Sequence, residues 1–384
     1  MSTRKQIAFI RPKPIPLANV KMSETIAAEF PECDIDVIDV KPLITQNAGI
    51  LVINSILTLL LFSQDILTRR KKFREAFWRT PYIFTKAKQL LIKRLAHKKY
   101  WFTFQMQSLF DCSLPDTPHF IYTDHTHLAN LNYPGFNRQS LYDKWVKLER
   151  QIYKNAGINF VRSSNIRQSL IDQYHQASDK AVLVYAGSNI EPDKFTHENK
   201  TYTNQNILFV GMDWERKGGP ELLQAFELVL QRFPKATLTI AGTKPKVHLP
   251  NCLVLGQVPP SELKRFYQSA SVFCLPTRKE PFGIAYLEAM QARLPIVSTN
   301  IGAVPDFIQN NWNGILVEPG DVQGIANGIM KLLADEELCE LFGERNIRIS
   351  QERYSWKVVG NKIHKYIVEY LSKGIEDNTS ANPR

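Results

Sequence analysis

The pattern of apolar and polar positions divides the chain into two halves, each of which mixes strands with helices. In the second half, residues 206–350 alternate apolar strands with amphipathic helices, an order typical of a parallel, doubly wound sheet. In the first half, short apolar runs predict strands near residues 7–10, 35–40, 120–123, 160–161 and 182–184. The sequence therefore predicts an α/β protein with two domains.

A turn-rich stretch is expected to mark the domain boundary. Residues 186–205 contain Gly187, Pro192 and several polar residues before the next apolar strand begins. At 384 residues the chain also exceeds the usual size of a single core. The expected divisions are a first domain over 1–187, a second over 188–355, a final helix over 356–373 and a loose tail over 374–384.

Two carboxylates flank a Phe-Gly step in the second half. Glu280 follows a short apolar strand, and Glu288 lies about one turn inside a predicted helix. The N–H groups of Phe282, Gly283 and Ile284 lie between them at the helix N-terminus, a natural seat for a phosphate. One carboxylate can meet a sugar and the other a ribose diol, so the stretch suits a nucleotide sugar. By themselves these residues could equally be two solvated glutamates in an ordinary loop.

Two cations follow the first strand of the second half. An apolar run over 206–210 ends at Gly211, and Arg216 and Lys217 lie in the loop before the next helix. Gly211 would allow the backbone to approach a ligand closely, and the dipeptide brings two positive charges to one loop. A basic dipeptide is usually only solvated, so its meaning here depends on its place in the fold.

The order and spacing of these motifs resemble the donor half of retaining family-4 glycosyltransferases, over about residues 200–356. The matching runs are E-x-F-G-x-x-x-x-E-A-M from Glu280, L-P-I-V-S-T from Leu294, G-A-V-P-D from Gly302 and N-G-I-L-V from Asn313. Ala303 and Asp306 depart from the Gly and Glu that are usual in the family. The resemblance implies the GT-B fold, in which two Rossmann-like domains face each other across a cleft. It also implies that the C-terminal helix crosses back to the first domain.

The resemblance assigns roles as well. Arg216 and Lys217 would neutralise the departing diphosphate, Glu280 would contact the transferred sugar, and Glu288 would bind the ribose hydroxyls. The expected donor, most often a UDP-sugar in such enzymes, would also contact Gly211, Phe282, Gly283 and Ile284. The first domain would bind the acceptor.

A histidine pair follows the strand predicted near 120–123, at a strand end where ligands collect in α/β sheets. In the family a histidine after this strand contacts the transferred sugar, and His125 fits that spacing, with His127 as the alternative. Two histidines without a further Cys or carboxylate ligand do not complete a zinc site. No metal and no other cofactor is expected.

The net charge is concentrated in one segment. Residues 69–99 contain twelve basic residues and one acid, Glu75, so the segment has the same formal charge of +11 as the whole chain. Aromatic residues are interleaved from Phe73 to Phe102. A basic region with aromatics suits an anionic bilayer surface. We predict docking there through Arg69, Arg70, Lys71, Lys72, Arg74, Trp78, Arg79, Lys86, Lys88, Lys93, Arg94, Lys98 and Lys99.

Other interpretations of this region remain open. Basic and aromatic residues also bind nucleic acids, although no recognisable nucleic-acid-binding module accompanies them. No nucleic acid is expected as a partner. An ordinary solvated face would show the same composition. Upstream, the apolar run over 48–62 is too short to span a bilayer comfortably, and it could be a core helix or a lipid-facing surface.

The expected localisation is cytoplasmic, with peripheral association to the cytoplasmic face of a membrane. Five scattered cysteines without a paired spacing favour a reducing compartment, and no secretory signal is expected. The expected function is retaining transfer of a sugar to a lipid or membrane-associated acceptor. The alternatives are a soluble family-4 enzyme acting on a small aglycone or polysaccharide intermediate, a nucleotide-sugar epimerase, and a binding module without catalysis.

Overall fold

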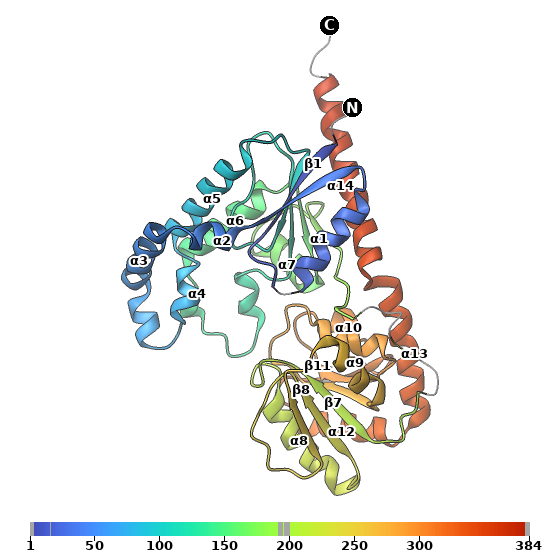
Figure 1. The fold of residues 1–384 in the computed structure, drawn as a ribbon. Helices are drawn as coiled ribbons and strands as arrows, with labels where there is room; N and C mark the ends of the chain where they lie inside the picture. Colours follow the sequence, from blue (N-terminus) through green and yellow to red (C-terminus); the bar gives the residue numbers. More distant parts are fainter. Residues whose placement is uncertain (1–3, 16, 191–194, 196–199, 381–384) are drawn as a thin grey trace. The chain divides into compact units, whose positions relative to one another are not determined.

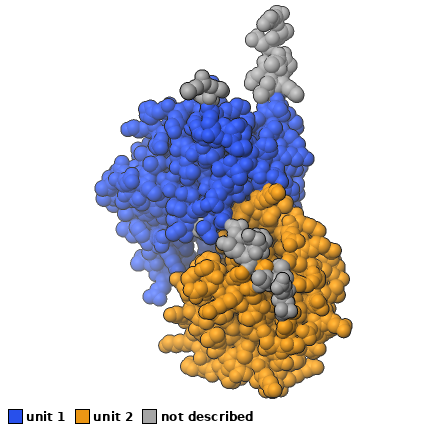
Figure 2. All heavy atoms as spheres, turned by 45° about the vertical axis from the view of Figure 1, so that its right-hand side comes forward, with its two compact units in different colours: residues 1–131, 135–185, 359–384 blue, residues 132–134, 186–358 orange. Residues whose placement is uncertain are grey.

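Each half of the chain folds around a six-stranded parallel sheet, as the computed structural model shows (Figure 1). The structure describes residues 4–15, 17–190, 195 and 200–380. Residues 1–131, 135–185 and 359–384 form unit 1, and residues 132–134 and 186–358 form unit 2 (Figure 2). The turn-rich stretch expected at the boundary falls partly outside the described residues, at 191–194 and 196–199.

The sheet of unit 1 has the order β2-β1-β3-β4-β5-β6, with every pair parallel. Its central positions are apolar on both faces: Ile7 to Ile10 in β1 are fully buried, as expected of a parallel sheet between helices. The strands are β1 (Lys5–Arg11), β2 (Cys33–Asp39), β3 (Phe102–Met106), β4 (His119–Thr123), β5 (Ile158–Val161) and β6 (Ala181–Leu183). Strand β3 was not predicted from the sequence, because its Phe102 was counted among the aromatics of the basic segment.

The helices of unit 1 begin at recognisable caps. Asn47 accepts a hydrogen bond from the Ile50 N–H (3.1 Å) at the start of α3, and Thr80 does the same for Ile83 (3.1 Å) at the start of α5. The helices are α1 (Ala18–Glu29), α2 (Val40–Thr45), α3 (Ala48–Leu67), α4 (Phe73–Phe77), α5 (Pro81–Leu95), α6 (Asp143–Asn155) and α7 (Ser164–Asp172), with short 3₁₀ turns η1 (Leu128–Asn132) and η2 (Arg138–Ser140).

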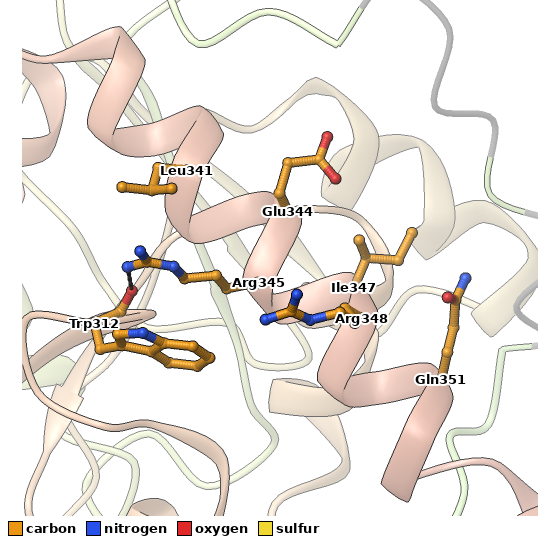
Figure 3. Close-up of a pocket in the computed structure, with 7 residues that line it drawn as sticks. All are labelled: Trp312, Leu341, Glu344, Arg345, Ile347, Arg348 and Gln351. Carbon is orange, nitrogen blue, oxygen red and sulfur yellow. Dashed lines mark hydrogen bonds between the residues drawn. The ribbon is translucent and has the colours of Figure 1, made fainter.

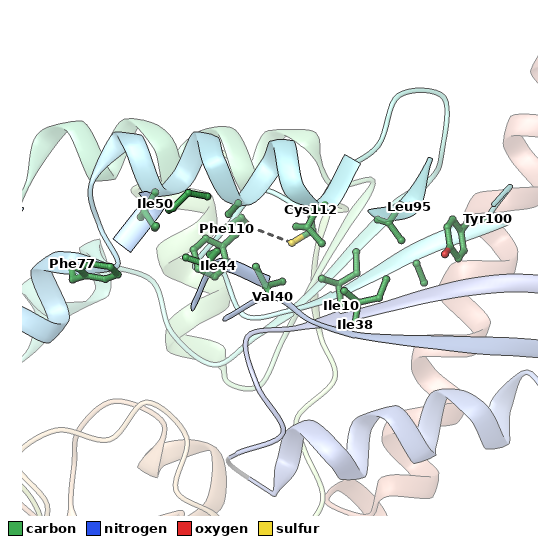
Figure 4. Close-up of a cluster of buried hydrophobic side chains, with 14 residues drawn as sticks. Ile10, Ile38, Val40, Ile44, Ile50, Phe77, Leu95, Tyr100, Phe110 and Cys112 are labelled. Atoms are coloured by element: carbon green, nitrogen blue, oxygen red, sulfur yellow. Dashed lines mark hydrogen bonds between the residues drawn. The ribbon is translucent and has the colours of Figure 1, made fainter. Parts of the chain in front are cut away.

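Most apolar residues of the basic segment belong to the core of unit 1. Phe77, Ile83, Leu91, Leu95 and Tyr100 pack with side chains of β1, β2 and α2 in one buried cluster (Figure 4). Phe84 belongs to a second cluster around α6 and α7. The aromatic residues Phe77, Phe84 and Tyr100 were expected at a membrane interface, and that part of the prediction is wrong. Their spacing reflects the packing of α4 and α5 against the sheet.

Helix α3 buries two polar side chains and exposes many apolar ones, the opposite of a typical helix on a protein surface. Its buried face includes Asn54 and Thr58, which are fully buried, whereas large apolar side chains on other faces are exposed to solvent. The exposed fractions of these side chains lie between 41% and 82% for Val52, Ile53, Ile56, Leu59, Leu60, Leu61 and Leu67. The helix has 20 residues, more than the fifteen of the apolar run that predicted it. Within the described part of the chain it is the one helix whose length and composition would suffice to cross a membrane.

The sheet of unit 2 has the order β12-β11-β10-β7-β8-β9, again with every pair parallel. The strands are β7 (Asn206–Val210), β8 (Thr237–Ala241), β9 (Cys252–Gly256), β10 (Val272–Leu275), β11 (Ile296–Thr299) and β12 (Gly314–Val317). The helices are α8 (Gly219–Arg232), α9 (Pro260–Ser269), α10 (Ile284–Gln291), α11 (Val304–Phe307), α12 (Val322–Leu333) and α13 (Glu336–Arg353).

The last helix, α14 (Trp356–Ser380), starts in unit 2 and packs on unit 1. Its Tyr370 ring lies edge-on to Phe120 of β4, with ring centroids 5.4 Å apart, and Ile363 and Ile367 are fully buried. The return of the C-terminal helix to the first domain is therefore confirmed. The helix extends beyond residue 373, where we expected it to end, so part of the expected loose tail is helical.

Candidate active site

The carboxyl ends of three neighbouring strands bring the predicted donor-side loops together. β10 pairs with β7 on one side and with β11 on the other. Because β7 is the first strand of unit 2, chain order reverses beside it, and open α/β sheets bind ligands at such a switch point. The loops are joined directly: the Arg278 N–H donates to the Arg216 carbonyl (2.8 Å), and the Ala303 N–H donates to the Glu280 carbonyl (2.9 Å).

Lys217 and Glu280 form a buried ion pair at this edge. The Lys217 Nζ donates to the Glu280 Oε2, and the two side chains are only 10% and 4% exposed. A Cβ added to Gly211 would lie 3.0 Å from the Lys217 Cγ. Gly211, which we expected to admit a ligand, therefore makes room for the stem of Lys217 in this structure.

Arg216 keeps more contact with solvent than Lys217 does. Its Nε lies 3.2 Å from Asp213 Oδ2, its Nη1 donates to the Lys279 carbonyl (2.9 Å), and its side chain is 35% exposed. These two contacts hold the guanidinium beside the loop that contains Glu280. The two predicted cations thus meet the predicted carboxylate, one through an ion pair and the other through the adjoining backbone.

Gly283 permits the turn that starts α10 beside the ion pair. Its φ is +100°, and an added Cβ would lie 2.5 Å from the Tyr286 ring and 3.1 Å from the Glu280 Cδ. Phe282 is buried, and its ring centroid is 5.3 Å from that of Phe307. The Tyr286 N–H donates to the Gly283 carbonyl (3.1 Å), whereas the N–H groups of Ile284 and Ala285 lack intrahelical acceptors by geometry, so this edge also favours negative charge.

Glu288 lies deeper in unit 2 than the sequence suggested. It is 5% exposed, and the hydroxyl of Tyr267 in α9 donates to its Oε2 (2.8 Å). Burial raises the pKa of Glu288 to about 7, although the Tyr267 hydrogen bond opposes the shift. Tyr267, which the sequence analysis did not single out, therefore positions this carboxyl.

His125 lies in unit 1, at the hollow that follows β4. Its Nε2 is 3.2 Å from Asn130 Oδ1. The hollow has a volume of about 230 Å³, and Glu149 and Trp145 help to line it. His127 is buried, and its backbone N–H donates to both carboxylate oxygens of Glu149 (3.2 and 3.0 Å). No group of three His, Cys, Asp or Glu side chains suited to a metal ion occurs among the residues that the structure describes.

Glu149 is a buried carboxylate that the sequence analysis missed. It accepts hydrogen bonds from the Ser108 and Tyr153 hydroxyls (3.1 and 3.0 Å), and the Tyr174 hydroxyl donates to it as well. Burial raises the pKa of Glu149, and these donors oppose the shift. Glu149 lies on α6, and only the fold brings it next to the loop after β4, so its hydrogen bonds to that loop could not be predicted from the sequence.

The structure divides the predicted membrane-binding residues into three groups. Some have internal partners: Lys71 pairs with Asp65 (2.9 Å), Lys88 with Asp111 (3.1 Å), and Lys98 and Arg94 with Asp36 (3.1 and 3.7 Å). Trp78 packs partly buried against the core cluster, Lys86 lies partly buried on α5, and Arg79 lines the His125 hollow. The remaining members are exposed and form no such ion pair with any residue that the structure describes: Arg69, Arg70, Lys72, Arg74, Lys93 and Lys99.

A second hollow, on α13 of unit 2, was not predicted from the sequence. It measures about 560 Å³ and is lined by Trp312, Arg345 and Arg348 among others (Figure 3). The Arg345 Nη1 donates to the Trp312 carbonyl (2.6 Å), and its guanidinium lies 4.8 Å from the Trp312 ring centroid. Arg345 is thus engaged with Trp312, and the predicted donor residues do not line this hollow.

The matching family model and two relatives of this chain all carry the name of glycosyltransferases. The family model described as "Glycosyl transferases group 1" matches residues 191–348. The capsular polysaccharide biosynthesis glycosyltransferase CapM of Staphylococcus aureus is 27% identical over 232 residues, covering 55% of this chain and 61% of that protein. A D-inositol 3-phosphate glycosyltransferase of Corynebacterium jeikeium is 26% identical over 311 residues, 73% of each chain. The chain spans about three fifths of the length of the first curated relatives that it matches.

Solved structures show the fold over nearly the whole chain. Sucrose-phosphate synthase from Thermosynechococcus elongatus has a TM-score of 0.71 at 16% identity, covering 96% of this chain and 100% of that one. Anabaena HepE, solved in complex with UDP and glucose, has a TM-score of 0.65 at 14% identity, covering 95% and 100%. With the two parallel sheets and the returning helix, these likenesses confirm the predicted GT-B fold.

The buried ion pair yields a stability prediction. Lys217→Met should destabilise the protein by about 3–5 kcal/mol, because it leaves the Glu280 carboxylate buried without its partner. Adding Glu280→Gln should recover a large part of that loss. Urea unfolding of the single and double variants measures both effects. As a control, Arg216→Ala breaks an exposed pair and should cost no more than about 1 kcal/mol. Equal, additive losses in the two single variants would contradict the coupling.

The raised pKa of Glu288 yields a pH prediction. Between pH 4.5 and about 7 the folded state keeps a proton that the unfolded state has lost, so the contribution of this group to stability falls as pH rises. The full effect is roughly 3 kcal/mol. The unfolding free energy of wild type minus that of Glu288→Gln should therefore decrease across this window. A difference that stays constant with pH would contradict the shift.

Proposed function

Because residues 191–348 belong to the glycosyl transferases group 1 family in a chain with the GT-B fold, we propose that the protein moves a sugar from a nucleotide-sugar donor to an acceptor. The observation that carries this proposal is the buried Lys217–Glu280 pair beside Arg216 and the N-terminus of α10. Cations and helix N–H groups suit a diphosphate, and a fixed carboxylate suits sugar hydroxyls. HepE, which shares the fold, holds UDP and glucose, which supports UDP as the nucleotide.

The proposed reaction proceeds with retention at the anomeric carbon. The bond between that carbon and the diphosphate oxygen breaks, and a bond to the acceptor oxygen forms on the same face of the sugar. The departing diphosphate takes the proton of the acceptor hydroxyl. Arg216 and Lys217 stabilise the charge that develops on the diphosphate, so the site needs no metal for this purpose.

The other predicted residues take supporting roles in this proposal. Glu280 binds the transferred sugar, and the ion pair with Lys217 fixes its carboxylate in place before the donor arrives. Glu288, oriented by Tyr267, binds the ribose hydroxyls. His125, whose ring is oriented by Asn130, is the other residue proposed to bind the transferred sugar.

We also propose that the acceptor is a lipid or is associated with a membrane, and that α3 lies in the plane of an anionic bilayer. The polar face of α3 is tied to unit 1: the Asn54 Nδ2 donates to the Phe77 carbonyl (2.8 Å), and the Thr80 hydroxyl donates to the Asn54 Oδ1. Because these buried bonds would be lost, the helix does not leave the domain to span the bilayer. Its exposed apolar face can still enter the lipid.

The charge next to α3 supports an anionic membrane as the partner of this face. Arg69, Arg70, Lys72 and Arg74 follow the end of the helix, and all four are exposed. Basic residues near an anionic surface contribute about 1 kcal/mol each, and fully burying a Leu or Ile side chain contributes about 1.5–3 kcal/mol. The two contributions together would hold the protein at the cytoplasmic face without a spanning segment.

Removal of either predicted cation should slow sugar transfer. Arg216→Ala and Lys217→Ala should each lower the rate about 10²–10³-fold, because each removes a charge aimed at the departing diphosphate. The assay is nucleotide release from a panel of nucleotide sugars, with lipid extracts as acceptors and with or without EDTA. Arg278→Ala is the matched control, because Arg278 lies in an adjoining loop and pairs with Glu221. An absolute metal requirement, or normal turnover in both variants, would count against the proposal.

Binding to vesicles should separate the apolar and the electrostatic contributions of the membrane face. Wild type should bind anionic vesicles more tightly than neutral ones, and binding should weaken, but not vanish, as salt shortens the Debye length from roughly 10 Å at 0.1 M to 3 Å at 1 M. Changing Arg69, Arg70, Lys72 and Arg74 to Gln should remove the salt-sensitive part. Changing Ile53, Ile56 and Leu60 to Ser should remove the part that persists at high salt.

The control for charge alone is a variant with four exposed basic residues of unit 2 changed to Gln, namely Arg232, Lys235, Lys246 and Arg265. This variant should bind anionic vesicles like wild type, because the lost charges lie outside the membrane face. Sedimentation with vesicles measures all four proteins. Absence of binding to any vesicle would instead favour a soluble acceptor, such as a small aglycone or a polysaccharide intermediate.

A further inference from the structure

Arg79 differs from the other members of the basic segment in where its side chain lies. It is partly buried and lines the hollow after β4 together with His125, Ser108 and Trp145. Its backbone is fixed, because its N–H donates to the Ala76 carbonyl (2.9 Å) at the end of α4. The next residue, Thr80, caps α5 and is hydrogen-bonded to Asn54 of α3. The backbone at Arg79 is therefore held by its neighbours, and the residue lines the hollow.

The acidic groups at this hollow are engaged with other partners. Asp124 Oδ2 lies 3.2 Å from Arg162 Nη1, and Glu149 is enclosed by hydroxyl and backbone donors. Among the residues that the structure describes, no carboxylate lies within ion-pair distance of Arg79. Arg79 thus lines the hollow without an ion-pair partner among the described residues, and His125, the residue assigned to the reacting sugar, lines the same hollow.

We infer that this hollow binds a phosphate group of the acceptor, and that Arg79 is the residue that selects it. A guanidinium offers a planar fork of donors that matches two phosphate oxygens. A volume of about 230 Å³ admits a phosphate with a few attached atoms, and a longer acceptor would extend out of the hollow. The inference rests on the proposed function, since it describes what the acceptor must present to this enzyme.

Trp145 supplies a local readout of binding. Its ring is 3% exposed and lines the same hollow, so a ligand there should shift its signal while binding at the donor residues should not. The full chain is labelled with 5-fluorotryptophan, and the Trp145 resonance is assigned with Trp145→Phe. Inorganic phosphate, glycerol 3-phosphate and dihexanoyl phosphatidic acid are titrated, with acetate and dihexanoyl phosphatidylcholine as comparison ligands.

The expected result is a saturable shift of the Trp145 resonance with each phosphate monoester. The dissociation constant should rise about tenfold or more in Arg79→Gln, the effect of losing a charge-assisted hydrogen bond. Arg79→Lys should lie between Arg79→Gln and wild type. Arg74→Gln, which removes an exposed charge nearby, should bind like wild type. An unshifted Trp145 resonance in the unliganded variants verifies that the hollow is intact.

The ligand series also identifies the source of the phosphate. Tighter binding of dihexanoyl phosphatidic acid than of glycerol 3-phosphate indicates a lipid headgroup, and the reverse order indicates a free phosphate ester. The inference is overturned if no phosphate ligand shifts Trp145 saturably, if Arg79→Gln binds as tightly as wild type, or if acetate binds as well as phosphate. The measurement requires no sugar transfer, so a bound phosphate in a chain that proves inactive would reject the proposed function and leave this site standing.

Discussion

The proposed donor site of unit 2 depends on the buried ion pair between Lys217 and Glu280. Neither charge would tolerate this burial alone, because an unpaired ion in a protein interior costs several kcal/mol. Lys217 follows β7 and Glu280 follows β10, so the pair exists only because those two strands are neighbours in the sheet. The backbone around it is shaped to fit, with Gly211 against the lysine stem and Gly283 against the glutamate. A donor would therefore meet a carboxylate and a cation that are already oriented.

In unit 1, one buried hydrogen bond links two surfaces with different chemistry. Thr80 donates to Asn54 of α3 and also caps α5. On one side of this bond, α3 exposes its apolar face and ends beside four exposed cations. On the other side, the residue before Thr80 is Arg79, which enters the His125 hollow. The proposed membrane contact and the proposed phosphate contact thus depend on the same packing of α3 against α4 and α5.

The loops at the strand ends of unit 2 were predicted from sequence far better than the buried partners of the carboxyl groups. Arg216, Lys217 and Glu280 were identified because each lies in a short loop directly after an apolar strand, and parallel strands bring such loops to one edge. Glu149 and Tyr267 could not be identified in this way. Each lies on a helix among ordinary polar positions, and its importance comes from the carboxylate, backbone or hydroxyl partner that folding places opposite it.

The sequence by itself determined the alternation of strands and helices, the two-domain organisation and the loops that contain the donor residues. These features follow from hydrophobic periodicity and from turn residues, which are properties of near neighbours in the chain. Only the tertiary structure decided which face of each element is buried. It placed Phe77, Phe84 and Tyr100 in the core, left the apolar face of α3 outside, and separated Arg79 from the surface cations around it. Composition does not distinguish a buried residue from an exposed one of the same type. Burial and interaction partners depend on segments that are distant in the sequence.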